Sequence, residues 1–292
     1  MANPGNPILQ EDIAGFMKIA HGLDEREGRK LSFLYRKSGI NTRFSVLTDF
    51  EKANHEDFEF FPKSKNLEPF PSTKSRMGVF TQEAPRLCYA AFTGLKLADK
   101  IIRSDSQAKV LVVTVELCTL HFQKDYLEDN ILANSLFGDG AAAALVSSSP
   151  SGLAIKSYLS RVLREGEQDM AWGIGDFGFE MKLTKYIPSL LDGGIQQLKA
   201  MFEDKFNLSK IKNFAIHPGG MQILAKVQEA FGLGKEVNFH AMEVLKQFGN
   251  MSSSLVLFVL SRMMKDVEIE GDILSMGFGP GLTLETLLLE KA

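Results

Sequence analysis

The sequence predicts an α/β protein, because long helical patterns alternate with short, strongly apolar stretches. Apolar residues recur at helical spacing over 11–38 and again over 187–207. Between these segments, AKVLVVTVEL (108–117) is a continuous apolar run, which is typical of a strand that is buried on both faces. A strand, turn and helix order recurs around NFAIHPGG (213–220), without a repeat at the level of sequence.

The other segments fit the same class in chain order. Residues 49–76 are charged and contain three prolines, so we expect an irregular surface connection there rather than a packed element. The remaining expected elements are a helix after Cys88, a turn and strand in LFGDGAAAALVSS (136–148), a strand in LAIKSYLS (153–160), a helix from about Met221, a helix over Ser252 to Lys265, and two strands joined by GFGPG (277–281).

Composition limits the class of protein. The 292 residues are 45% hydrophobic and 24% charged, which suits one large soluble domain or two fused halves. A net charge of -3 gives no general attraction to nucleic acid or an anionic membrane, and the apolar runs are too short to span a bilayer. The polar opening MANPGNPILQ does not resemble a secretory signal. Two cysteines without metal-like spacing argue against disulfides and zinc, so we expect a cytoplasmic protein without a metal.

Three reactive side chains stand at the starts of predicted helices, namely Cys88, His217 and Asn250. Cysteine attacks acyl groups as the thiolate, and a helix N-terminus favours that anion. A histidine and an amide supply proton transfer and hydrogen-bond donors for a developing oxyanion. The three residue types together therefore indicate acyl-transfer chemistry.

Each of these residues also has a purely structural interpretation. A lone cysteine is more often simply buried, and Cys118, at the end of the 108–117 strand, is expected to be a small, inert hydrophobic residue. A histidine at a strand end is often only hydrogen-bonded, and Asn250 before three serines is a common helix cap. GFGPG could be only a tight turn. Of the other histidines, His121 stands out because it closes the strand end ELCTLHF.

Taken together, the amino-acid sequences of the motifs are more specific than any single residue. The series CYAAFTGLKLAD, VVTVEL, LFGDGAAAALV, AIHPGG, FGNMSSSLVLF and GFGPGLTLET closely resembles the type III polyketide synthases, the chalcone synthase-like branch of the thiolase superfamily. The resemblance runs from ANPGNP to the last strand. It implies a layered αβαβα thiolase-like fold of two similar halves, with the nucleophile in 1–150 and the histidine and asparagine in 151–292.

The resemblance implies a role for each matching residue. Cys88 would take an acyl starter from coenzyme A as a thioester, while His217 and Asn250 would orient malonyl-CoA and stabilise the enolate formed on decarboxylation. His217 would also keep the thiol ionised through an ion pair. The implied enzyme is an acyltransferase, a homodimer that condenses malonyl-CoA with an acyl-CoA starter into a pyrone, resorcinol or chalcone-type product. Coenzyme A thioesters would be substrates, with no permanently bound cofactor.

Further positions match residues of the family's cavity and coenzyme A site. Phe137 corresponds to an aromatic gatekeeper, Met181 falls near a second gatekeeper, and His121 stands where the plant enzymes have a cavity-shaping threonine. Lys30 and Lys37 correspond to residues that contact the coenzyme A phosphates, although Phe33 replaces the expected arginine between them. The wall on which the polyketide cyclises would include the five residues Gly277, Phe278, Gly279, Pro280 and Gly281.

The chain departs from the family just before Cys88, where QEAPRL (82–87) runs directly into CYAAF. The family has a further helix, a central strand, a glycine-rich loop, another helix and the strand that delivers the nucleophile at this point. We therefore expect part of the N-terminal half, including the first strand of the fold, to be missing. Two alternatives stay open: a ketoacyl-ACP synthase III-like enzyme that performs one condensation, and an inactive truncated paralogue that acts as a binding subunit.

Overall fold

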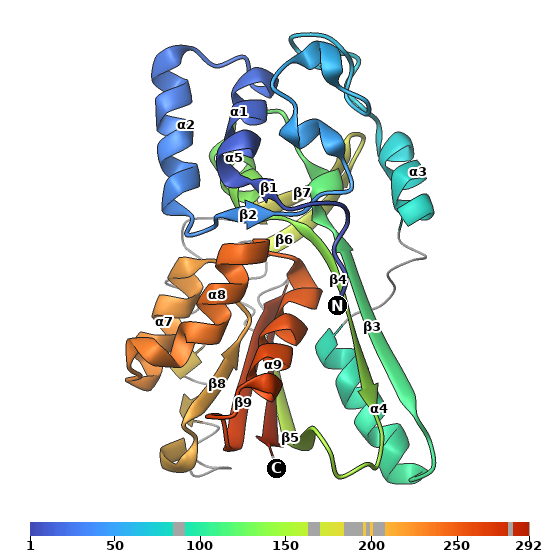
Figure 1. Cartoon of the computed structure of the whole chain (residues 1–292), viewed down its shortest axis with the longest axis vertical. Helices are drawn as coiled ribbons and strands as arrows, with labels where there is room; N and C mark the ends of the chain where they lie inside the picture. Colours follow the sequence, from blue (N-terminus) through green and yellow to red (C-terminus); the bar gives the residue numbers. More distant parts are fainter. Residues whose placement is uncertain are drawn as a thin grey trace.

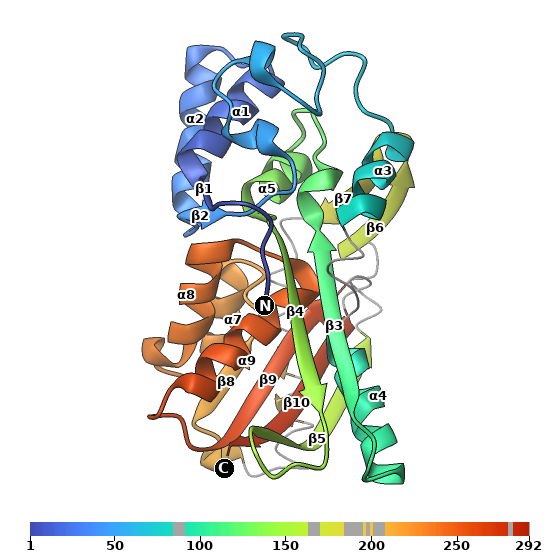
Figure 2. The same cartoon turned by 45° about the vertical axis from the view of Figure 1, so that its right-hand side comes forward.

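The computed structural model of the chain describes residues 1–83, 91–162, 170–183, 195–196, 199–200, 208–279 and 283–291. The molecule is elongated, with helices α1 (Gln10–Ala20), α2 (Glu25–Lys37) and α3 (Thr73–Glu83) at one end of its long axis (Figure 1). A layered body of sheets and helices forms the other end (Figure 2). No helix in the described part of the chain combines the length and the apolar character that a membrane crossing requires.

The elements follow the predicted mixture of helices and strands. The remaining helices are α4 (Ala91–Ser104), α5 (Glu128–Leu136), α7 (Met221–Phe231), α8 (Phe239–Phe248) and α9 (Leu255–Lys265). The strands are β1 (Ile8–Leu9), β2 (Thr42–Arg43), β3 (Val110–Leu117), β4 (Asp139–Val146), β5 (Leu153–Val162), β6 (Met170–Gly175), β7 (Gly178–Leu183), β8 (Asn213–Ile216), β9 (Gly271–Gly279) and β10 (Thr283–Lys291). Short 3-10 turns include η1 (Thr48–Glu51), η2 (His55–Asp57), η4 (Cys118–His121) and η8 (Ser252–Ser254).

A four-stranded sheet with the order β5-β10-β9-β8 forms the centre of the layered body. Strand β8 runs parallel to β9, and the other neighbours are antiparallel. Every residue from Ile273 to Phe278 is buried, although successive side chains point to opposite faces of a sheet. Both faces of β9 are therefore covered by other parts of the protein.

Strands β3 and β4 form a separate two-stranded sheet, called here the β3–β4 ribbon. Helix α4 contacts both strands of the ribbon as well as β10, and α9 contacts β4 and β8. The two helices therefore lie between the ribbon and the four-stranded sheet, as Figures 1 and 2 also show. This arrangement places two sheets around a central helical layer.

The segment 11–38 is helical as predicted, but it forms two helices, α1 and α2. Gly22 has a φ of +60°, in the left-handed region that glycine adopts without steric cost. This conformation ends the first helix. Asp24 then begins the second helix, since its carboxylate accepts a 2.8 Å hydrogen bond from the Glu27 amide and the Glu27 side chain completes a capping box.

The expectation that 49–76 is unpacked is also wrong. The segment contains 3-10 turns and irregular chain, but its aromatic side chains are buried around Phe16. The ring of Phe16 lies 4.7 Å from that of Phe50, 5.3 Å from Phe58 and 5.5 Å from Phe61, measured between centroids. The phenylalanines of the segment form part of a core, although its charged residues and prolines predicted a surface connection.

The 108–117 stretch forms β3, but the prediction that it is buried on both faces is wrong. Leu111 is 63% exposed, and its direct cross-strand partner Leu145 is 65% exposed. Among the described residues, this end of the outer surface is uncovered, whereas Val115 and Leu117 on the same face pack against the core around Phe16. Most of the expected helix over 187–207 lies outside the described residues.

Candidate functional site

His217 and Asn250 border the same glycine. His217 directly follows β8, and its amide donates a 2.7 Å hydrogen bond to the carbonyl of Met276 on β9. The Gly219 amide donates to the His217 carbonyl at 2.9 Å, and the Gly219 carbonyl accepts from Asn250 Nδ2 at 3.1 Å. A Cβ on Gly219 would lie 3.5 Å from His217 Nε2. The HPGG segment thus brings two of the predicted site residues together.

The backbone around Asn250 is fixed by the LFGDG segment. Helix α8 ends at Phe248, and Gly249 turns the chain with a φ of +68°. Asn250 then forms a parallel bridge with Phe137, in which its amide donates to the Leu136 carbonyl at 2.8 Å and its carbonyl accepts from Gly138 at 2.9 Å. Two motifs that are far apart in the sequence therefore meet at Asn250.

The side chain of Asn250 has both a structural and a donor function. Its Oδ1 accepts a 2.8 Å hydrogen bond from the Ser252 amide, which forms a turn of the Asx type. The helix-cap interpretation is wrong, because the N-caps of η8 and α9 are Met251 and Ser254. The Nδ2 group carries two hydrogens, and the contact with Gly219 uses one of them. The turn and the Gly219 contact therefore orient the amide, and one of its two hydrogens is not used by that contact.

Burial controls the charge of His217, which is 8% exposed. Removal from water lowers the pKa of His217 to about 4, because the charged imidazolium is poorly solvated in the interior. At neutral pH the ring is therefore neutral, with one nitrogen that donates a hydrogen bond and one that accepts.

Cys88 lies outside the described residues, as do Pro280 and Gly281. Helix α4 begins at Ala91, and its Phe92 ring occupies the space beside Gly277, where a Cβ would collide with it. Gly277 directly follows Met276, the residue that binds the His217 amide. The first turn of α4 therefore packs on the part of β9 that positions His217.

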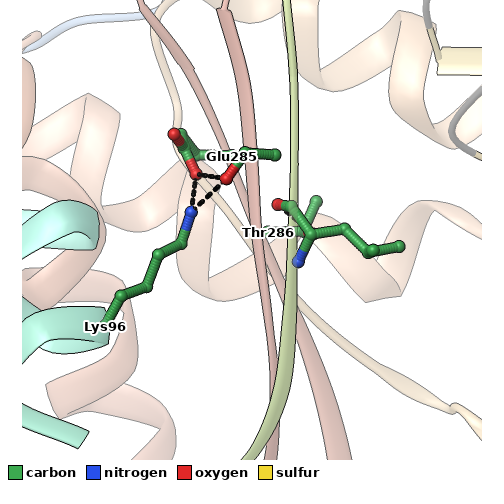
Figure 3. Close-up of polar contacts among 5 residues, drawn as sticks. Lys96, Glu285 and Thr286 are labelled. Atoms are coloured by element: carbon green, nitrogen blue, oxygen red, sulfur yellow. Dashed lines mark hydrogen bonds and ion pairs between the residues drawn. The ribbon is translucent and has the colours of Figure 1, made fainter. Parts of the chain in front are cut away.

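One turn later, Lys96 attaches α4 to the same sheet (Figure 3). Its ammonium group contacts the Glu285 carboxylate on β10 and the Ser160 hydroxyl on β5, and that hydroxyl donates to Glu285 at 2.8 Å. Glu285 is the cross-strand partner of both Gly277 and Ser160. Next to it, the Thr286 hydroxyl donates to the Leu159 carbonyl at 2.9 Å. These contacts fix the position of the helix that follows Cys88.

Phe137 and His121 line a common cavity of about 40 Å³, which has room for water but not for a polyketide. The ring of His121 stacks on Phe179 with centroids 4.5 Å apart, and burial lowers the pKa of His121 to about 4. Cys118 also lines this cavity. It is buried, and burial raises the pKa of its thiol well above the usual value, as expected for an inert residue.

Two buried carboxyl groups near the site were missed in the sequence. Glu116 accepts hydrogen bonds from the amide and hydroxyl of Ser253, and burial raises its pKa. Asp139 is fully buried, accepts from the Thr119 amide at 2.8 Å and from the Val46 amide at 2.8 Å, and has a pKa raised by burial to about 6. A charged residue within an otherwise apolar strand was the signal for both.

The remaining predicted positions lie on α2, on β7 and at the end of β9. Lys30 and Lys37 are exposed on α2, where the Lys37 ammonium lies 5.6 Å from the centre of the Phe33 ring. Met181 belongs to β7, opposite Trp172 in the backbone register. Gly277, Phe278 and Gly279 complete the end of β9.

Two family descriptions match the chain. Residues 154–292 match the C-terminal domain of chalcone and stilbene synthases, and residues 84–161 match 3-oxoacyl-[acyl-carrier-protein (ACP)] synthase III. Over 217 residues the chain is 30% identical to the alpha-pyrone synthesis polyketide synthase-like Pks18 of Mycobacterium tuberculosis, with 70% of this chain and 55% of the relative covered. A putative chalcone synthase of Bacillus subtilis is 32% identical, with 69% of this chain and 59% of the relative covered. The chain thus spans about half the length of the curated relatives that it matches.

Solved structures confirm the predicted fold class. PKS-I from the brown alga Ectocarpus siliculosus superposes with a TM-score of 0.89 at 21% identity, covering 99% of this chain and 96% of that one. The 1,3,6,8-tetrahydroxynaphthalene synthase of Streptomyces coelicolor superposes with a TM-score of 0.84 at 20% identity, covering 100% and 97%. The fold is therefore the thiolase-like α/β fold of these proteins. In sequence and in fold, the chain is therefore similar to the type III polyketide synthases.

Proposed function

We propose that the chain is an acyltransferase that condenses malonyl-CoA with an acyl-CoA starter to build a polyketide. The observation that carries this proposal is the meeting of His217 and Asn250 around Gly219, where the Asn250 amide donates at 3.1 Å. Two neutral hydrogen-bond donors in a buried place suit the stabilisation of an enolate oxygen. The similarity to type III polyketide synthases supports the same chemistry.

The proposed first step is acyl transfer to Cys88. The thiolate attacks the carbonyl carbon of the starter thioester, a carbon–sulfur bond forms, and coenzyme A leaves as its thiolate. The described support for this step is the packing of α4 on β9, through Phe92 against Gly277. A thiolate beside His217 would favour the imidazolium and raise its pKa from about 4, which is how the proposed ion pair would form.

The second step is decarboxylative condensation. Malonyl-CoA loses carbon dioxide, and the electron pair of the broken bond becomes the enolate of acetyl-CoA, whose oxygen would accept from His217 and Asn250. The enolate carbon then attacks the Cys88 thioester, and the thiolate of Cys88 leaves. The product is a coenzyme A thioester lengthened by two carbons, which can return to Cys88 for another extension.

Intact-protein mass spectrometry after incubation with a panel of acyl-CoAs tests the first step. We expect the mass of the acyl group to be added to the wild type and to Cys118→Ala, the matched control for a buried thiol, and to be lost in Cys88→Ala. Equal loading of Cys88→Ala and wild type would refute the assignment of the nucleophile.

Release of carbon dioxide from malonyl-CoA tests the second step. Removing one oxyanion donor typically lowers a rate by about a hundredfold to a thousandfold, so we expect that loss for Asn250→Ala. Decarboxylation should continue in Cys88→Ala, because the enolate donors are intact. Equal rates in wild type and Asn250→Ala would contradict the role of the amide.

A second candidate is a single condensation of the 3-oxoacyl-ACP synthase III type, which the match over residues 84–161 favours. A product with one extension, or a requirement for acyl carrier protein, would establish it. A third is a non-catalytic binding subunit. It predicts no acylation in the mass measurement and co-purification with a full-length polyketide synthase. A homodimer and a cytoplasmic location remain part of the leading proposal.

A further inference from the structure

Arg43 lies where the segments that carry Phe137 and Asn250 cross. It is only 2% exposed and belongs to β2. The residues before it bind the end of α8, since the Asn41 amide donates to the Lys246 carbonyl at 2.7 Å and the Thr42 hydroxyl donates to the Gln247 carbonyl at 2.6 Å. Strand β2 therefore holds Arg43 beside the chain that leads into Asn250.

The guanidinium group of Arg43 closes the C-terminal end of α5. Its Nη1 donates to the Asn134 carbonyl at 2.8 Å and also to the Phe137 carbonyl. Carbonyls in the last turn of a helix lack partners within the helix, and a cation there is favoured by the helix dipole. Helix α5 accordingly ends at Leu136, and Phe137 turns into an extended conformation.

The aliphatic part of the Arg43 side chain packs against both motif backbones. A Cβ on Gly249 would lie 2.7 Å from Arg43 Cγ and Cδ, and a Cβ on Gly138 would lie 3.4 Å from Arg43 Cβ. Gly249 directly precedes Asn250, and Gly138 directly follows Phe137. One buried side chain thus contacts both sides of the Phe137–Asn250 bridge.

We propose that Arg43 is a positioning residue that keeps the Asn250 amide in register with Phe137, and so sets the enolate donor and the gate of the condensation site together. The catalytic part of this inference rests on the proposed function. Burial lowers the pKa of Arg43, but Tyr35 and Asp139 favour the charged form, and an arginine remains a cation in proteins. A misplacement of about an ångström at a reacting group can lower a rate a hundredfold.

Amide hydrogen exchange measured by NMR tests the bracing without any catalysis. In Arg43→Met we expect the amides of Gly138 and Asn250 to exchange at least tenfold faster than in wild type. The His217 amide, which donates to Met276, should stay within about twofold. In Arg43→Lys the exchange rates of Gly138 and Asn250 should lie between those of wild type and Arg43→Met, because an ammonium binds one carbonyl as a point charge. Arg29→Met, at a side chain that is 71% exposed, is the matched control and should follow wild type.

Two rates then test the catalytic consequence. Carbon dioxide release from malonyl-CoA should fall at least tenfold in Arg43→Met, while acylation of Cys88 should stay within about twofold. If Arg43→Met does not fold, the amide exchange and the two rates are measured on Arg43→Lys instead.

Unchanged exchange at Gly138 and Asn250 would overturn the inference. So would an equal rise at all three amides, or an equal fall of both rates, because Arg43 would then only stabilise the fold. If the wild type itself releases no carbon dioxide, the proposed function fails, whereas the exchange measurement still decides whether Arg43 braces Asn250.

Discussion

The four-stranded sheet and the β3–β4 ribbon contain similar apolar strands but differ in how they are covered. In β9, six successive residues from Ile273 to Phe278 are buried. In the ribbon, the cross-strand pair Leu111 and Leu145 is 63% and 65% exposed. Apolar side chains stabilise a protein by the area that they remove from water, so the same residue types contribute far more in the first sheet than in the second.

The space beside the ribbon shows the same difference. A groove of about 680 Å³ lies between α4, α9, the β4–β5 connection and the edge of β10. The groove opens to solvent, so the side chains that line it are less completely removed from water than those of β9. The difference teaches that the site residues on the four-stranded sheet are firmly held, whereas the ribbon leaves one end of its outer surface in water.

The largest effect is expected for Leu287→Ala in β10. Leu287 is fully buried in the core that surrounds the four-stranded sheet, and truncation of such a leucine costs about 2–5 kcal/mol through lost burial and a cavity. Urea denaturation measures the free energy of unfolding. The control is Leu97→Ala on α4, where the side chain is 59% exposed and a change within about 0.5 kcal/mol is expected. Similar losses for both variants would contradict the difference in coverage.

Acidification should weaken the sheet through His217. Its pKa is about 4 in the folded chain, below the ordinary value of 6.5, so the unfolded state binds the proton first as the pH falls. Stability is therefore lost between pH 6.5 and 4, by about 3 kcal/mol for a pKa difference of this size. We expect His217→Asn to reduce this loss in urea denaturation at a series of pH values, with both chains compared in a Cys88→Ala background that removes the proposed thiolate partner.

Asp139 provides a control of opposite sign. Its folded pKa of about 6 lies above the ordinary 3.8, so its titration makes the fold less stable as the pH rises from 4 to 6. Removal of that titration in Asp139→Asn should steepen the loss on acidification. A shallower loss in Asp139→Asn, or an unchanged one in His217→Asn, would show that these groups are not buried as described.

A smaller effect is expected for Lys96→Met, which tests the attachment of α4 to the sheet. The side chains of Lys96 and Glu285 are only 12% and 22% exposed, so loss of the ammonium leaves a partly buried carboxylate without its cation. We expect a loss of about 1–3 kcal/mol in urea denaturation. Lys100→Met, at an exposed position of the same helix, should change stability by less than about 0.5 kcal/mol. Equal effects would mean that the Glu285 contact does not hold α4.

The smallest effect is expected on the ribbon itself. Leu145→Thr replaces a side chain that is 65% exposed by a residue that suits a strand, so the free energy of unfolding should change by less than about 0.5 kcal/mol. The same measurement on Leu288→Thr, which alters a buried leucine of β10, is the comparison. A loss above about 2 kcal/mol at Leu145 would show that another surface covers the ribbon in solution.

Local patterns in the sequence were enough to predict the α/β class, the strands β3, β5 and β8, and the helix that begins at Met221. Periodicity reports which faces of an element are apolar, and capping and turn residues report where it ends. The same patterns did not separate α1 from α2, because the helical spacing continues across Gly22 and Asp24. Nor did they predict that the phenylalanines of 49–76 pack around Phe16, since that core forms between segments without a regular period.

The residues of the motifs were enough to indicate the resemblance to type III polyketide synthases and to select His217 and Asn250 as candidate site residues. Only the tertiary structure decided how those two residues meet, through Gly219, and that Arg43 packs against Gly249, directly before Asn250. It also decided that the apolar 108–117 strand leaves Leu111 in water. The physical reason is that a sequence records which side chains favour burial or hydrogen bonding, whereas the partner of each group depends on long-range packing between segments.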